Sequence, residues 1–465
     1  MAGNRRPLAA LIVDNPLRDL DGLVLLAATL VGKGIDAVLV PMYEQGFDVP
    51  ALRPDVVVAN YVRDNNRDLL AAYRGLGSRI VILDSEGAAG RTAEAYARMV
   101  ANAKPAEVVD DYCVWGRARH GALLASGALP EERVHLTGCP RYDFCAEPWS
   151  AALPAPSAPT GFILVNTNFP LPNPRFAASV EEERRTLQRV WNDPGYVAAV
   201  NRDARTAFEG MLRAIERLAR RFPDRAVVVR PHPFEAVAPY EALESPGNLS
   251  VRQEGTSLEW IRAAAMLVHQ NCTTAVEAVM LGREPISLEW LSTEALRLPG
   301  PSAVSVAARS EEELERMVAE VLAGRSPAPT PECARARSET VEELFFANDG
   351  RSSQRAAEVI ARCLSRERTS TANPRRRVRS VGVDFARRLL GYEASNFLRR
   401  SARGKRDGAR RAAKAYSAGA VSAILRRISA AAPGLAECVA APVPGSLVAS
   451  PRLASGQAVY IGRES

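Results

Sequence analysis

Short apolar runs alternate with amphipathic stretches along the first 140 residues. The runs are rich in Val, Ile and Leu, which is typical of strands buried on both faces of a parallel sheet. The stretches between them have helical spacing, so the pattern predicts a βαβα order. The predicted strands are 8–14, 36–42, 55–61, 79–84, 107–115 and 134–138, and the predicted helices are 19–32, 65–76, 91–103 and 117–126.

A second series of the same kind follows a proline-rich break. Residues 151–161 contain three prolines and are predicted to be a linker. We therefore expect an α/β protein with two Rossmann-like domains, 1–150 and 162–365, whose strand ends face each other across a cleft. In the second domain the predicted strands are 162–168, 226–232, 248–252, 266–271 and 284–290, and the predicted helices are 196–221, 258–264, 273–281, 310–323 and 338–364.

The charge composition is unusual only near the C-terminus. The chain of 465 residues has ordinary totals for a globular protein, 47% hydrophobic and 24% charged, and a net charge of +7. Between Arg366 and Lys414, sixteen Lys and Arg residues stand against four acidic ones, so the rest of the chain is mildly acidic. Residues 366–465 are predicted to be a basic tail, helical over 385–400 and 409–428 and disordered over the last thirty-odd residues.

The basic composition of the tail is compatible with two environments, a membrane surface or bulk solvent. Its basic residues 366–428 are expected to meet an anionic membrane surface, or else to be simply solvated. Aromatic residues are sparse there and no nucleic-acid motif is found, so no nucleic-acid partner is expected. No apolar run could span a bilayer and no export signal is recognised, so we expect a cytoplasmic protein, peripheral at the inner face of the membrane.

Cysteine and histidine usage narrows the chemistry. The seven cysteines have no C-x-x-C spacing, which argues against both a disulfide framework and a zinc site. Only four histidines are present, so the surroundings of each are informative.

The first candidate motif is Asp84-Ser85-Glu86-Gly87, directly after a predicted strand. Two carboxylates at a strand end could take a proton from an attacking hydroxyl group. A turn with helix-capping acids would show the same residues. The motif leaves open which of Asp84 and Glu86 is the base.

The second candidate is Arg230-Pro231-His232-Pro233, again at a strand end. The two prolines restrict the backbone around His232. A histidine beside an arginine suits a nucleotide phosphate or a leaving phosphate. The alternative is a rigid loop whose histidine only satisfies a backbone carbonyl.

The third candidate is the segment 269–278, where a strand ends and a helix begins. His269, Asn271, Thr273 and Thr274 precede or open the helix, and a helix N-terminus with hydroxyl groups can bind an anion. Glu277, one turn further, could reach a ribose hydroxyl. A capping box made by a threonine and Glu277, with His269 buried, is the structural alternative. A fourth motif, 138–143, is interpreted mainly as a hinge.

Taken in order, these segments resemble bacterial surface carbohydrate biosynthesis proteins with a GT-B fold, of the capsule and lipopolysaccharide type. The resemblance spans about residues 8–364 and does not include the tail. It is carried by LDSEG (83–87), TGCPRYD (137–143), VNTNF (165–169), RPHPFE (230–235) and HQNCTTAVEA (269–278).

The motif set is also similar to that of GT-B sialyltransferases and polysialyltransferases. The resemblance implies that Glu86 or Asp84 is the base, that His232 meets the phosphate, and that Thr273 and Thr274 anchor it. It also implies a nucleotide-sugar co-substrate, CMP-linked by preference, and no further cofactor. One departure is that Ser85 interrupts the acidic pair. No Asp-x-Asp triplet stands at a strand end, so metal-independent transfer is expected, with the phosphate neutralised by His232, Arg230 and the helix start.

The predicted function is therefore transfer of a sugar from a nucleotide donor to a growing surface polysaccharide or lipid-linked glycan. Three alternatives share the fold or the motifs. They are an epimerase of the UDP-N-acetylglucosamine 2-epimerase type, a glycerophosphotransferase using a CDP-glycerol-type donor, and a non-catalytic partner in polysaccharide assembly.

Overall fold

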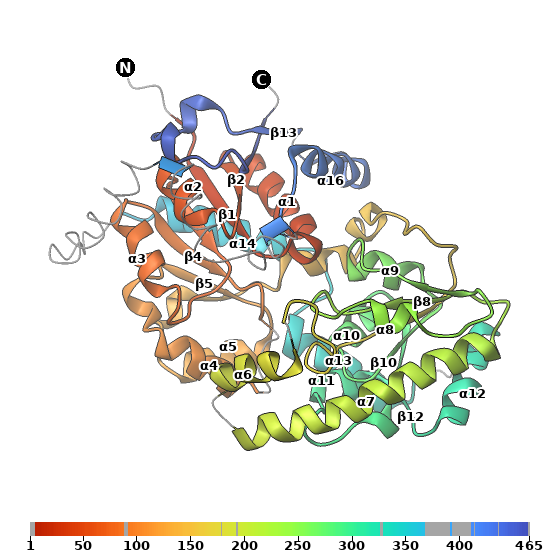
Figure 1. Cartoon of the computed structure of the whole chain (residues 1–465). Helices are drawn as coiled ribbons and strands as arrows, with labels where there is room; N and C mark the ends of the chain where they lie inside the picture. Colours follow the sequence, from red (N-terminus) through yellow and green to blue (C-terminus); the bar gives the residue numbers. More distant parts are fainter. Residues whose placement is uncertain are drawn as a thin grey trace. The chain divides into compact units, whose positions relative to one another are not determined.

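The chain forms two compact α/β units, each built on its own sheet (Figure 1). The first unit contains Met1–Ala152 and Glu342–Ser465, and the second contains Leu153–Val341. The predicted α/β class with two Rossmann-like sheets is confirmed. No helix in the described part of the chain is both long and apolar enough to cross a membrane. The computed structural model describes residues 5–87, 92–177, 179–191, 194–325, 329–367, 391–392, 411–412, 414–435 and 437–463.

The first sheet has eight strands in the order β13-β14-β2-β1-β3-β4-β5-β6. The six strands from β2 to β6 are parallel, and they coincide with the six predicted apolar runs. Their carboxyl ends therefore lie along one edge, where ligands of open sheets bind. The bounds are β1 Leu8–Val13, β2 Asp36–Pro41, β3 Val56–Ala59, β4 Arg79–Leu83, β5 Asp111–Val114, β6 Val134–Leu136, β13 Cys438–Pro442 and β14 Val459–Arg463.

Helices cover both faces of this sheet, as its apolar strands require. On one face, strand residues such as Ile12, Val57 and Ile82 pack with Tyr73 and Val100 of the covering helices. On the other face, α1 packs against β1, β2, α14 and α16. The bounds are α1 Pro16–Gly32, α2 Gln45–Leu52, α3 Arg67–Gly75, α4 Ala93–Asn102, α5 Arg117–Ala125, α14 Ser352–Ser365 and α16 Ala418–Ala431.

The second sheet is wholly parallel, in the order β12-β11-β10-β7-β8-β9. The long helix α7 and helix α12 close one core, while α9 and α10 close the other face around Trp260. Five of its six strands coincide with predicted ones, and β12 was not predicted. The bounds are β7 Ile163–Asn166, β8 Val227–Arg230, β9 Leu249–Val251, β10 Met266–His269, β11 Glu284–Leu288, β12 Val306–Ala308, α6 Val180–Trp191, α7 Pro194–Arg221, α8 Ala238–Glu241, α9 Ser257–Ala263, α10 Thr274–Met280, α11 Pro299–Val304 and α12 Glu311–Leu322.

The predicted helix 338–364 is two helices, α13 (Pro331–Phe345) and α14. Gly350, at φ +67°, lies in the break between them, and its carbonyl accepts a hydrogen bond from Trp149 Nε1 at 2.9 Å. Helix α14 then packs on the first unit, although the sequence pattern placed it in the second domain. Asp143 holds it there, because its buried carboxylate accepts the backbone N–H groups of Ser352 and Ser353, each at 2.7 Å.

The C-terminal residues differ from their prediction. Residues 438–463 were expected to be disordered, but β13 and β14 form an antiparallel hairpin that pairs with the edge of β2. Alternate residues of β14, Val459 and Ile461, are buried, and the Tyr460 hydroxyl donates to Asp36 at 3.0 Å. The hairpin covers an edge that β2 would otherwise expose. Of the predicted helix 385–400, all but 391–392 lies outside the described residues.

Asp143 provides a test of how α14 is held. Replacing Asp143 with Ala removes the acceptor of two buried helix N–H groups, so we expect the free energy of unfolding to fall by about 3 kcal/mol. Urea unfolding would measure it. The matched control is Asp349→Ala, which removes a half-exposed acceptor from the same helix start and should cost below about 1 kcal/mol. Equal losses in the two variants would contradict the proposed role of Asp143.

Candidate functional site

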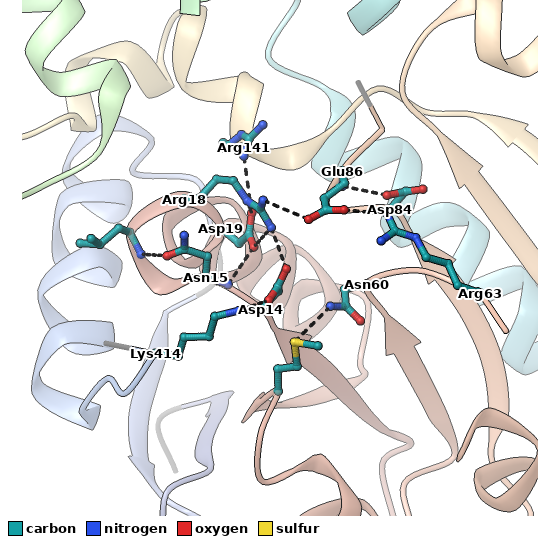
Figure 2. Close-up of polar contacts among 12 residues, drawn as sticks. Asp14, Asn15, Arg18, Asp19, Asn60, Arg63, Asp84, Glu86, Arg141 and Lys414 are labelled. Atoms are coloured by element: carbon teal, nitrogen blue, oxygen red, sulfur yellow. Dashed lines mark hydrogen bonds and ion pairs between the residues drawn. The ribbon is translucent and has the colours of Figure 1, made fainter. Parts of the chain in front are cut away.

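In the first unit, polar side chains gather where β1, β3 and β4 end (Figure 2). Asp14 follows β1, Asn60 follows β3, and Asp84 follows β4. Because β3 pairs with both β1 and β4, these three positions belong to neighbouring strands. The sequence had singled out only the last of them.

Asp84 is buried, with 2% of its surface exposed. Its carboxylate accepts hydrogen bonds from the Tyr96 and Tyr112 hydroxyls at 2.7 and 3.0 Å, and from the Glu86 backbone N–H at 2.7 Å. Burial raises the pKa of the Asp84 carboxyl, and these hydrogen bonds oppose the shift. Asp84 therefore shapes the turn from inside, rather than presenting a carboxylate to a ligand.

Glu86 is the solvent-accessible carboxylate of the motif, with 36% of its side chain exposed. Arg63 Nη2 donates to Glu86 Oε2 at 2.6 Å, and Arg18 Nη1 lies 3.9 Å from the other oxygen. Gly87 is required by close approach, because a Cβ there would overlap the ring of Trp115. Of the two predicted acids, Glu86 is the one that a substrate could contact.

Arg18 links these groups into a network that the sequence analysis missed. Its guanidinium pairs with Asp14 at 3.0 Å and with Asp19 at 2.7 Å, and Lys414 Nζ donates to Asp14 at 2.6 Å. Burial lowers the pKa of Arg18, but the carboxylates of Asp19, Asp14 and Glu86 outweigh it, so the pKa is raised. Burial likewise raises the pKa of Asp14, but Arg18 and Lys414 lower it overall. The signal in the sequence was a charged run, DNPLRD (14–19), directly after a strand.

In the second unit, His232 lies in the loop after β8. Its Nδ1 accepts the backbone N–H of Phe234 at 3.2 Å, and its ring stacks with the Phe234 ring at a centroid distance of 5.6 Å. The neutral imidazole therefore carries its hydrogen on Nε2. His232 is part-buried and Pro231 is buried, so the proline-bounded loop holds the ring in one orientation.

Glu235 fixes the shape of this loop. Nothing in the sequence pattern assigned it a separate role. Glu235 is fully buried and accepts hydrogen bonds from His232 N at 2.9 Å, Thr167 Oγ1 at 2.9 Å and Tyr240 Oη at 2.5 Å. Burial raises the pKa of its carboxyl, against these hydrogen bonds. Through Glu235 the loop after β8 is fastened to the residue after β7.

Arg230 was predicted to bind phosphate, but the structure shows another use of its side chain. The guanidinium donates to the carbonyls of Glu254 at 2.6 Å and Gly255 at 3.1 Å, and it lies 5.1 Å from the ring centre of Trp260. Burial lowers the pKa of Arg230 to about 10. Arg230 therefore holds the 254–255 loop.

The segment 269–278 divides into supporting and site-facing residues. His269 is fully buried, with its Nε2 2.8 Å from Ser305 Oγ. Asn271 is also buried and holds the following loop, where its Oδ1 accepts Leu298 N at 3.0 Å and its Nδ2 donates to the Leu296 carbonyl. Neither residue presents a polar group to solvent, so the alternative of a buried, satisfied histidine is what the structure shows.

The capping box considered from the sequence is not formed. Thr273 precedes α10 without a side-chain capping bond, and Glu277 accepts the Ser257 hydroxyl at 2.7 Å instead. Thr273 and Thr274 are only partly buried, whereas Glu277 is 5% exposed. Thr273 and Thr274 are therefore the partly exposed residues among the predicted phosphate anchors, and the Thr274 hydroxyl donates to Cys272 Sγ at 3.1 Å.

Asn166, at the end of β7, joins the two halves of this edge. Its Nδ2 donates to Thr274 Oγ1 at 3.1 Å, and the next residue, Thr167, bonds to Glu235. Because β7 lies between β10 and β8, His232 and Thr274 stand on either side of it at one edge. The Asn166 Oδ1 atom is buried and has no hydrogen-bond partner among the described residues.

His269 allows a test by pH. Burial lowers the pKa of this imidazole to about 3, whereas in the unfolded chain it protonates near pH 6.5. Between those values the unfolded state binds a proton that the folded state does not, so stability falls as the pH falls. From pH 7 to pH 5, the wild type should lose about 2 kcal/mol more unfolding free energy than His269→Asn in urea titrations. An equal loss in both would contradict a neutral, buried His269.

No family model and no curated protein matches this chain. Three solved structures illustrate what the chain is similar to. The Staphylococcus aureus MnaA complex with UDP is 14% identical, covers 79% of this chain and 100% of its own, and has a TM-score of 0.48. The Neisseria meningitidis UDP-GlcNAc 2-epimerase bound to UDP-GlcNAc has corresponding values of 13%, 77%, 100% and 0.46. The wall teichoic acid polymerase TagF has values of 11%, 77%, 88% and 0.43.

Proposed function

We propose that this chain is a glycosyltransferase that moves a sugar from a nucleotide donor, CMP-linked by preference, to a surface polysaccharide or lipid-linked glycan. The observation that carries the proposal is the edge of the second sheet. There, His232 is held in one orientation, and the partly exposed Thr273 and Thr274 carry hydroxyl groups after β10, on the other side of β7. These are donors of the kind that hold a phosphate group.

In the proposed reaction, an acceptor hydroxyl attacks the anomeric carbon while the bond from that carbon to the phosphate oxygen breaks. Glu86 takes the proton of the hydroxyl, as an accessible carboxylate can and the buried Asp84 cannot. The negative charge that develops on the phosphate is stabilised by His232 Nε2–H and by the Thr273 hydroxyl. The Thr274 hydroxyl joins them when it exchanges its present acceptor, Cys272 Sγ at 3.1 Å, for the phosphate. Arg230 contributes indirectly by holding the 254–255 loop.

Asn166 adds support for a bound ligand at this edge. A buried amide oxygen without a partner leaves a hydrogen bond unmade, which costs about 1–3 kcal/mol. A hydroxyl group of the donor could supply that bond after a small side-chain movement.

The direct test is incubation with CMP-, CDP- and UDP-linked sugars, with and without glycan acceptors, while nucleotide release is measured. We expect release that depends on the acceptor and persists in EDTA, since no metal ion is assigned to the reaction. Epimerisation of UDP-N-acetylglucosamine without an acceptor would contradict the proposal and show that the chain is an epimerase instead. Release of CMP from CDP-glycerol would replace it by the glycerophosphotransferase. Nucleotide binding without turnover would favour an assembly partner.

Replacing His232 should remove phosphate stabilisation. His232→Ala is expected to lower turnover by about 10²–10⁴-fold, because a positioned imidazole contributes that much to proton or charge transfer. The matched control is His120→Ala, a part-buried histidine on α5 that the proposal does not use. Steady-state kinetics of both variants would decide; a His232 variant as active as the His120 variant would contradict the assignment.

Replacing Glu86 should mainly affect catalysis, whereas replacing Asp84 should mainly affect stability. Glu86→Gln is expected to lower kcat by about 100-fold or more with little change in stability, because its ion pairs are partly exposed. Asp84→Asn is expected to lower the free energy of unfolding by about 2 kcal/mol, because it disturbs two buried hydrogen bonds and one part-buried one. Kinetics and urea unfolding of both variants test this, and full activity of Glu86→Gln would rule out Glu86 as the base.

A further inference from the structure

Phe234, two residues after His232, has an exposed ring that the proposed chemistry does not use. Its exposed fraction is 41%, which places it among the few large apolar residues of the described chain that lie at the surface. Single exposed apolar residues are common and need no function. Two features distinguish Phe234: the ring is rigidly held, and it lies beside His232.

The frame around Phe234 is built from two loops. Its backbone carbonyl accepts the Arg175 N–H at 2.8 Å, and Pro174 forms a bridge with Glu235. Asn173 Nδ2 donates to the Ala236 carbonyl at 2.8 Å. The loop carrying Phe234 is thus paired with residues 173–175. The buried carboxylate of Glu235 also holds this loop, by accepting the His232 backbone N–H.

Side-chain contacts fix the ring itself. The Phe176 and Phe234 rings form a T-shaped contact at a centroid distance of 5.6 Å and an interplanar angle of 77°. The His232 imidazole stacks on it at 5.6 Å and 24°. An aromatic ring held by an edge contact and a stacked neighbour loses little further entropy when a ligand packs on it.

We propose that Phe234 is the stacking surface for the pyranose ring of the donor sugar. This inference rests on the proposed function, which places the donor phosphate at His232. The ring 5.6 Å from the imidazole is within reach of a group bonded directly to that phosphate. In a nucleotide-sugar, the transferred pyranose is such a group, whereas the nucleobase is separated from the phosphate by the ribose. The C–H groups on one pyranose face pack well against an aromatic ring.

The test compares two ligands on the full-length chain. Calorimetry measures binding of UDP against UDP-N-acetylglucosamine, and of CMP against CMP-N-acetylneuraminate, for wild type, Phe234→Ala and Phe234→Tyr. We expect Phe234→Ala to weaken binding of the nucleotide-sugar about tenfold and to leave that of the bare nucleotide unchanged. Phe234→Tyr, which keeps the ring, should bind both like the wild type. Val180→Ala is the matched control, since it removes another exposed apolar side chain of the second unit.

The remaining outcomes distinguish a failure of this inference from a failure of the proposed glycosyltransferase function. Equal weakening of nucleotide and nucleotide-sugar would overturn it in favour of stacking on the nucleobase or of damage to the His232 loop. No change in either would show that the ring contacts no ligand. If the wild type binds none of the four compounds, the proposed function itself falls, and the inference with it.

Discussion

The buried carboxylate of Glu235 is the group on which the site of the second unit depends. A carboxylate without solvent is costly unless hydrogen bonds surround it, and Glu235 has them from Thr167, Tyr240 and the backbone of His232. These bonds come from the ends of two neighbouring strands and from helix α8. The loop that carries His232 and Phe234 is therefore fixed by the interior of its own unit. A ligand would meet a surface that is already formed, which lowers the cost of binding.

The first unit uses the same device twice. Asp84 receives two tyrosine hydroxyls and the Glu86 N–H, and so determines where Glu86 points. Asp143 receives two N–H groups of α14 and so fastens residues more than 200 positions apart. In both cases the buried acid is structural, and beside Asp84 the carboxylate of Glu86 is left accessible. This arrangement explains why a motif with two acids contains one candidate base.

Charge balance ties the C-terminal segment to the same edge of the first sheet. Lys414 pairs with Asp14, and Arg427 pairs with Asp21, so two acids of the first 21 residues are neutralised by residues near the end of the chain. Asp14 in turn pairs with Arg18, which lies near Glu86. The described part of the C-terminal segment is thus a component of the first unit.

The sequence by itself determined the two sheets, because buried parallel strands are continuous apolar runs. Eleven of the fourteen strands that the structure describes were visible as such. It also located the loops at strand ends where chemistry is possible. Short strands such as β12, and the hairpin within a Pro- and Ala-rich segment, gave no comparable signal, since their pairing partners lie far away in the chain. Only the tertiary structure decided which motif residues are accessible. His269 is buried beside Ser305 and the Arg230 guanidinium is taken up by the 254–255 carbonyls, whereas Glu86 and His232 are partly exposed. These contacts come from distant positions in the chain, so the sequence pattern does not reveal them.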